Sequence, residues 1–98
     1  MLESTYQAKL TTRLKKMFPG CMVLKNDSAH LQGVPDLSVL YNDRWAMLEV
    51  KVSADAAERP NQRHYVEKLS TMSFAAFIYP ENEQEVLDEL QHAFSSAR

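Results

Sequence analysis

Two short apolar segments on either side of a polar turn constrain the fold of this chain most strongly. Residues 36–41 and 45–52 are rich in β-branched, aromatic and aliphatic side chains. Asn42-Asp43-Arg44, which lies between them, combines residues that are common in turns. The pattern predicts a β-hairpin.

The register of this hairpin determines which charged residues meet. If the loop has an even number of residues, Leu40 faces Trp45 and Asp36 faces Glu49, whereas an odd loop breaks this pairing. Directly opposite residues have Cβ atoms about 4.5–5.5 Å apart, and like charges placed there are destabilising. A divalent cation between the two carboxylates reverses that effect. Lys51 lies two residues after Glu49, so on a strand both side chains point to the same face.

Two carboxylates beside a lysine indicate a metal site. Hard carboxylate oxygens without a neighbouring set of histidine or cysteine ligands favour Mg²⁺, or Mn²⁺ in its place, over Zn²⁺. Such an ion can assist hydrolysis of a phosphodiester, because it polarises a phosphoryl oxygen and acidifies a bound water. The ammonium of Lys51 can orient that water or offset the developing charge. This chemistry indicates nucleic acid as the substrate.

The rest of the chain predicts three helices and two further strands. Apolar residues at helical spacing indicate the helices, and short apolar runs bounded by turn residues indicate the strands. The last strand is a nearly continuous apolar run, so we expect it to be buried on both faces. The order is αβββαβα, a mixed sheet flanked by helices. The helices are expected at 2–18, from Pro60 and from Glu81, and the additional strands at 21–25 and 73–79.

At the charged residues of the hairpin, the chain resembles the PD-(D/E)XK nuclease superfamily. Pro35-Asp36 is similar to the first half of its signature and Glu49-Val50-Lys51 to the second half. Their short spacing resembles that of Holliday-junction resolvases and of small VRR-NUC type nucleases. The resemblance implies an α/β fold with a restriction-endonuclease-like core and the activity of a Mg²⁺-dependent deoxyribonuclease.

The resemblance also implies roles for residues near and beyond the hairpin acids. Glu3, early in the first helix, and Val50 would join Asp36 and Glu49 as metal ligands. Gln62 would join the two acids and Lys51 in the catalytic set. For Glu3 the alternative is a solvated first-turn glutamate that the helix dipole favours. For Gln62 the alternative is an ordinary exposed helix residue.

The chain is electrically polarised, although its formal net charge is only −2. Residues 1–25 carry five basic residues against Glu3, whereas residues 81–98 carry five acids against Arg98. Such a distribution can place phosphate contacts on one surface. The candidate nucleic-acid-binding residues are Lys9, Arg13, Lys16, Lys25, Arg59 and Arg63.

Composition favours one small domain that spans residues 1–98. Its 45% hydrophobic content is sufficient for a single core. The single cysteine, Cys21, excludes an internal disulfide and fits a reducing cytoplasm, either of a prokaryote or of a phage host. No run of about 18 apolar residues is present, so we expect no membrane partner.

Two classes of function are consistent with these features. The first is a Mg²⁺-dependent endonuclease that cuts DNA as a homodimer. The chain has no room for a separate sequence-reading domain, so we expect selectivity for DNA shape, as in branched DNA or Holliday junctions. Flaps or single strands are alternative substrates. The second class is a non-catalytic nucleic-acid-binding module on a degenerate nuclease fold.

Overall fold

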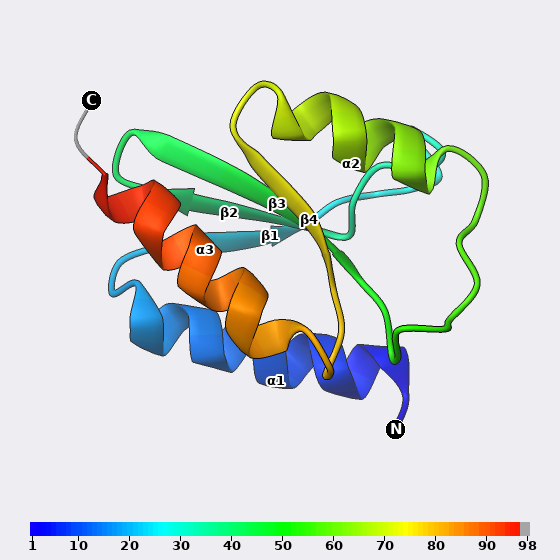
Figure 1. The fold of residues 1–98 in the computed structure, drawn as a ribbon, viewed down its shortest axis with the longest axis horizontal. Coiled ribbons are helices and arrows are strands. Elements are labelled where there is room, and N and C mark those ends of the chain that lie inside the picture. The colour runs from blue at the N-terminus through cyan, green and yellow to red at the C-terminus, as the bar shows by residue number, and fades with distance from the viewer. Residues whose placement is uncertain (97–98) are drawn as a thin grey trace.

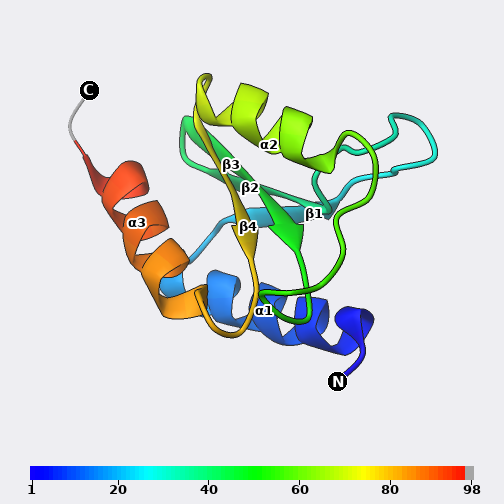
Figure 2. The same ribbon diagram turned by 45° about the vertical axis from the view of Figure 1, so that its right-hand side comes forward.

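The computed structural model describes residues 1–96 and has the element order that the sequence predicts. One four-stranded sheet lies between helices on its two faces (Figure 1, Figure 2). The helices are α1 (Glu3–Met17), α2 (Gln62–Ser70) and α3 (Glu83–Ser95), and the strands are β1 (Met22–Lys25), β2 (Leu37–Tyr41), β3 (Arg44–Val50) and β4 (Phe74–Ile78).

The sheet is mixed, and its strands lie in the order β1-β2-β3-β4. β2 pairs antiparallel with both β1 and β3, whereas β4 pairs parallel with β3. A parallel pair needs a crossover connection, and α2 provides it between β3 and β4. The prediction of a mixed sheet flanked by helices is therefore confirmed.

The hairpin formed by β2 and β3 has the even loop on which the predicted register depends. Only Asn42 and Asp43 lie between the two strands. Asn42 has a φ of +56°, a backbone conformation that asparagine adopts more readily than most residues. Leu40 faces Trp45 and Leu37 faces Leu48, so the predicted pairing is confirmed along the whole of β2.

The hydrophobic core lies between the sheet and the pair of helices α1 and α3, while α2 covers part of the opposite face (Figure 1). Each fully buried leucine or valine contributes about 1.5–3 kcal/mol relative to an exposed one. Within residues 1–96, no helix is both long and apolar enough to span a bilayer. The core side chains that are least exposed are Leu10, Leu14, Val39, Ala46, Leu48, Val50, Ile78, Leu87 and Leu90.

Two details of the sheet differ from the prediction. β4 was expected to be buried on both faces, but four of its five residues are only half buried, because it is an edge strand. β2 begins at Leu37, one residue later than expected, because the Asp36 side chain accepts the hydrogen bond from the backbone N–H of Val50. β3 ends at Val50, so Lys51 follows the strand, although its backbone N–H still donates to Ile78 of β4.

Candidate metal centre

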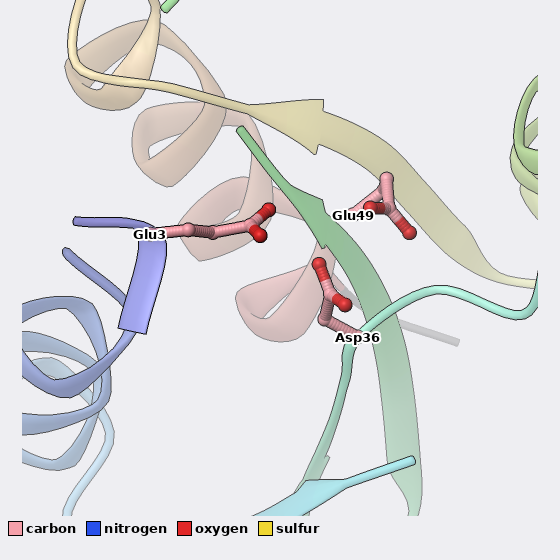
Figure 3. Close-up of side chains that lie close together, drawn as sticks. All are labelled: Glu3, Asp36 and Glu49. Carbon is pink, nitrogen blue, oxygen red and sulfur yellow. The ribbon is translucent and has the colours of Figure 1, made fainter. Parts of the chain in front are cut away.

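Three carboxylates from three separate segments meet at one end of the sheet. Glu3 is the first residue of α1, Asp36 immediately precedes β2, and Glu49 lies near the end of β3. One carboxylate oxygen from each lies within 4.8 Å of the others. Figure 3 shows the three side chains extending toward a common point. The structure thus brings together the three acidic side chains among the expected metal ligands.

The hairpin explains why two of these acids are neighbours. Alternation along β3 places Leu48 and Val50 in the core and turns Glu49 and Lys51 toward the opposite face. Asp36 Oδ2 accepts a hydrogen bond of 2.9 Å from the backbone N–H of Val50. This bond replaces one rung of the β ladder and fixes the Asp36 carboxylate beside that of Glu49.

Glu49 is the most unusual group in the site, because its carboxylate is buried and incompletely paired. Its side chain is 1% exposed. Oε2 accepts a hydrogen bond of 3.0 Å from Gln62 Nε2, but within residues 1–96 no group bonds to the buried Oε1. Burial, followed by the negative charge of Asp36, raises the pKa of Glu49 to about 8, whereas the Lys51 ammonium acts to lower it. An unpartnered buried charge is unfavourable unless a cation binds it.

Lys51 is held next to this carboxylate by two acceptors. Its Nζ donates to Gln62 Oε1 at 2.7 Å and to the Ala57 carbonyl at 3.1 Å, and lies 3.9 Å from Glu49 Oε2. Gln62 Oε1 also accepts the backbone N–H of Arg59 at 2.7 Å. Because both ends of the Gln62 amide are bonded, α2 begins with a residue that fixes the ammonium and the carboxylate relative to each other.

Gln62 is therefore not an ordinary exposed helix residue, because its side chain is buried in the site. Glu3 is exposed but lies within reach of the other two acids. The Val50 side chain is in the core, and its N–H is engaged by Asp36. Sequence reasoning missed the Ala57 carbonyl that holds Lys51, because a backbone contact depends on the path of residues 51–61 and leaves no mark in residue identity.

The site opens into a cavity of about 170 Å³, which we name the metal cavity. Its donors are hard carboxylate oxygens, three formal negative charges accompany the positive charges of Lys51 and Arg59, and one buried oxygen is unpaired. This combination fits a hard divalent cation such as Mg²⁺ or Mn²⁺. The cavity is lined by Glu3, Asp36, Glu49, Lys51, Val52, Ala56, Ala57, Arg59 and Gln62.

The six expected phosphate-binding residues are spread over the molecule. Arg59 lines the metal cavity. Arg13 instead forms an ion pair with Glu83 of α3, and Arg63 pairs with Glu58 and lies 5.0 Å from the ring centre of Phe77. The remaining three, Lys9 and Lys16 on α1 and Lys25 on β1, are exposed.

Comparisons of the chain with protein-family models, curated proteins and solved structures found no match. Function is therefore inferred from the chemistry of the site, which a fold alone does not specify.

Proposed function

We propose that the protein is a Mg²⁺-dependent endonuclease that hydrolyses DNA phosphodiester bonds. The observation that carries the proposal is the buried, unpaired Oε1 of Glu49 beside two further carboxylates and a lysine. Structural ion pairs are normally completed by their own partners, whereas this cluster has excess negative charge and open volume. A divalent cation supplies the positive charge that the cluster lacks.

The side chains have separate roles in this proposal. Glu3, Asp36 and Glu49 hold the ion, and when bound the ion supplies Lewis acidity and lowers the pKa of water. Lys51 Nζ, fixed 3.9 Å from Glu49, offsets negative charge that develops on the phosphoryl oxygens. Gln62 keeps the ammonium oriented by accepting a hydrogen bond from it through Oε1. The proposed catalytic set is thus Asp36, Glu49, Lys51 and Gln62.

The arrangement of the chain supports a restriction-endonuclease-like core. The element order αβββαβα and the mixed sheet flanked by helices agree with what the PD-(D/E)XK resemblance implies. Asp36 lies just beyond the last residue pair of the hairpin, where the hydrogen bond from Val50 holds it near Glu49, and Lys51 lies 3.9 Å from Glu49. These features support the enzyme over the degenerate binding module, because every charged group of the signature is present and converges.

A homodimer that acts on branched DNA in the cytoplasm is the form of the enzyme that we propose. A small chain gains selectivity when two identical sites are held at a fixed spacing. Met22, Leu24 and Leu40 support self-association, because these exposed apolar residues share one face of the sheet. Arg59, which lines the metal cavity, is suited to a phosphate contact.

A cleavage assay on four-way junction, flap, single-stranded and linear duplex DNA tests the proposal. We expect cutting with Mg²⁺ and none with EDTA. Asp36→Asn should abolish cutting while the protein remains folded, because the hydrophobic core does not involve this residue. Lys51→Ala should retain DNA binding and lower the rate constant for cleavage by roughly a hundredfold or more, the scale of losing one transition-state donor.

The same assay separates the enzyme from the binding module. Binding of DNA without metal-dependent cutting of any of the four substrates would support the module. Unchanged cutting by Asp36→Asn would contradict the metal assignment. A loss by Lys51→Ala that appears only in the dissociation constant for DNA would make the lysine a phosphate anchor.

A further inference from the structure

A second cavity adjoins the metal cavity and shares three of its residues. This cavity, of about 260 Å³, is bounded by the segment 28–34 and by Arg59 and Pro60, and we name it the loop cavity. Asp36, Arg59 and Gln62 line both cavities, so the two lie side by side. A strand whose phosphate lies at the metal site therefore has an adjoining space for its next nucleotide.

We propose that the loop cavity binds one unpaired nucleotide next to the bond that is cut. The inference rests on the proposed nuclease function and adds the class of substrate. It assigns the enzyme to DNA that is single-stranded at the cut, whether as a free strand, a flap or the unpaired bases of a branch point.

The walls of the loop cavity are held in place before any ligand binds. Gly33 has a φ of +93°, and a Cβ atom built on it would lie 2.6 Å from Cβ of Asn61. This close approach packs the loop against the residue that precedes α2. At the other end, Asn26 Nδ2 donates to the Pro35 carbonyl and Asn26 Oδ1 accepts from Ser38. A cavity with fixed walls requires less ordering when a ligand binds.

The size and lining of the cavity suit a single nucleobase. Its volume lies below the range of roughly 300–1,000 Å³ for drug-sized ligands, so it accepts one ring system rather than a base pair. Ala29, Val34 and Pro60 offer apolar contact to the face of a base. Ser28 and Gln32 offer hydrogen-bonding groups to its edge.

Arg59 lines both cavities, and its positive charge is available to bind a phosphate. Within residues 1–96 its guanidinium forms no hydrogen bond or ion pair, although its backbone N–H is bonded to Gln62. Arg13, Arg44 and Arg63 are by contrast each paired with an acid. A free guanidinium between a cation site and a base-sized cavity is suited to the phosphate that links two nucleotides.

Base pairing is incompatible with this placement. A base inside a cavity of this size has left its stack and its partner, which costs several kcal/mol in duplex DNA and much less in a single strand. The loop cavity therefore selects strands that are already unpaired at the cut.

A series of single-stranded oligonucleotides, each with one abasic nucleotide, tests the inference on the unmodified protein. The cut position is first located on the intact strand with Mg²⁺. We expect one abasic position next to the cut to lower kcat/KM on the order of tenfold, the scale of losing one stacked base. Abasic positions several nucleotides away should have little effect.

A variant that fills the loop cavity provides a second test of the inference. Ala29→Phe should lower kcat/KM for the intact strand by a similar factor and leave the rate on the abasic strand nearly unchanged. Gln91→Phe adds the same ring to an exposed position of α3, outside both cavities, and serves as the matched control. Thermal unfolding of each variant shows whether the fold is retained.

The outcomes separate the cavity from the nuclease. Equal cleavage of every abasic strand by the unmodified protein would overturn the loop cavity as a nucleotide site and leave the nuclease intact. If no strand is cut, the proposed nuclease fails, and binding measured by fluorescence anisotropy with Ca²⁺ in place of Mg²⁺ tests the cavity alone. Tighter binding of the intact strand than of the abasic strand would support the cavity, and equal binding would overturn it.

Discussion

Among the single residues, Glu49 is the one whose place in the fold is least favourable without a ligand. Its buried carboxylate has one unpaired oxygen and lies beside a second acid. Gln62 and Lys51 offset only part of that cost, through one hydrogen bond and an ion pair at 3.9 Å. Because its own partners leave one buried oxygen unpaired, the residue is better explained by binding than by folding.

The pH dependence of stability tests this assignment in the metal-free protein. The folded state raises the pKa of Glu49 from 4.5 to about 8, so it holds a proton that the unfolded state releases. The free energy of unfolding should therefore decrease as pH rises from about 4.5 to about 8, by at most about 1.4 kcal/mol per pH unit. Urea denaturation in EDTA at several pH values measures this slope.

Glu49→Gln is the control for that slope, because it keeps the shape of the side chain and removes its charge. We expect the free energy of unfolding of the variant to decrease less between the same pH values. Mg²⁺ should raise the unfolding midpoint of the unmodified protein most at the upper end of this range, where the carboxylate is ionised. Identical slopes for the variant and the unmodified protein would contradict the buried-charge assignment.

The hairpin is the element that the sequence predicts best. Its register follows from a two-residue turn and from the strict alternation of a strand, and Leu40 faces Trp45 as expected. The hydrogen bond from Val50 to Asp36 is not predictable in the same way, because it replaces a regular backbone rung. The incomplete burial of β4 was also missed, because an apolar run does not reveal which strand becomes an edge.

The junction of α1 and α3 is a contact between elements that sequence patterns do not reveal. Glu83, the first residue of α3, accepts a hydrogen bond of 2.6 Å from the Tyr6 hydroxyl and pairs with Arg13. Burial and the bond to Glu83 raise the pKa of Tyr6, so the hydroxyl remains a donor. Glu3 lies one helical turn before Tyr6, so this junction fixes the end of α1 that carries the third carboxylate.

Glu83→Ala should therefore affect both stability and metal binding. The Tyr6 hydroxyl loses its acceptor, which costs about 1–3 kcal/mol for a buried donor. We also expect the dissociation constant for Mg²⁺ to rise several-fold, because Glu3 is held less firmly. Chemical denaturation and calorimetric Mg²⁺ titration measure the two effects.

Glu85→Ala is the matched control, since it removes an exposed acid from the same turn of α3. It should change stability by less than about 0.5 kcal/mol and leave Mg²⁺ affinity unaltered. If Glu83→Ala lowers stability but binds Mg²⁺ as tightly as the unmodified protein, the junction is structural only.

In the whole molecule, the two faces of the sheet are covered unequally. α1 and α3 cover one face, whereas α2 packs against β3 and β4 and leaves the β1–β2 half of the other face open (Figure 1). Met22 and Leu40 face each other across that open half, with exposed fractions of 57% and 37%, and Leu24 adds 42% one row away. A contiguous apolar surface of this kind is typical of a protein interface.

We expect this open face to form the two-fold contact of the proposed homodimer. Met22→Glu should convert a dimer into a monomer, because like charges would meet across the symmetry axis, and its already exposed position should leave the fold stable. Paired cuts across a four-way junction should then become single nicks. Met72 is 60% exposed but follows α2, so Met72→Glu should leave the dimer intact. Sedimentation equilibrium measures the association, and equal dimerisation of both variants would exclude this face.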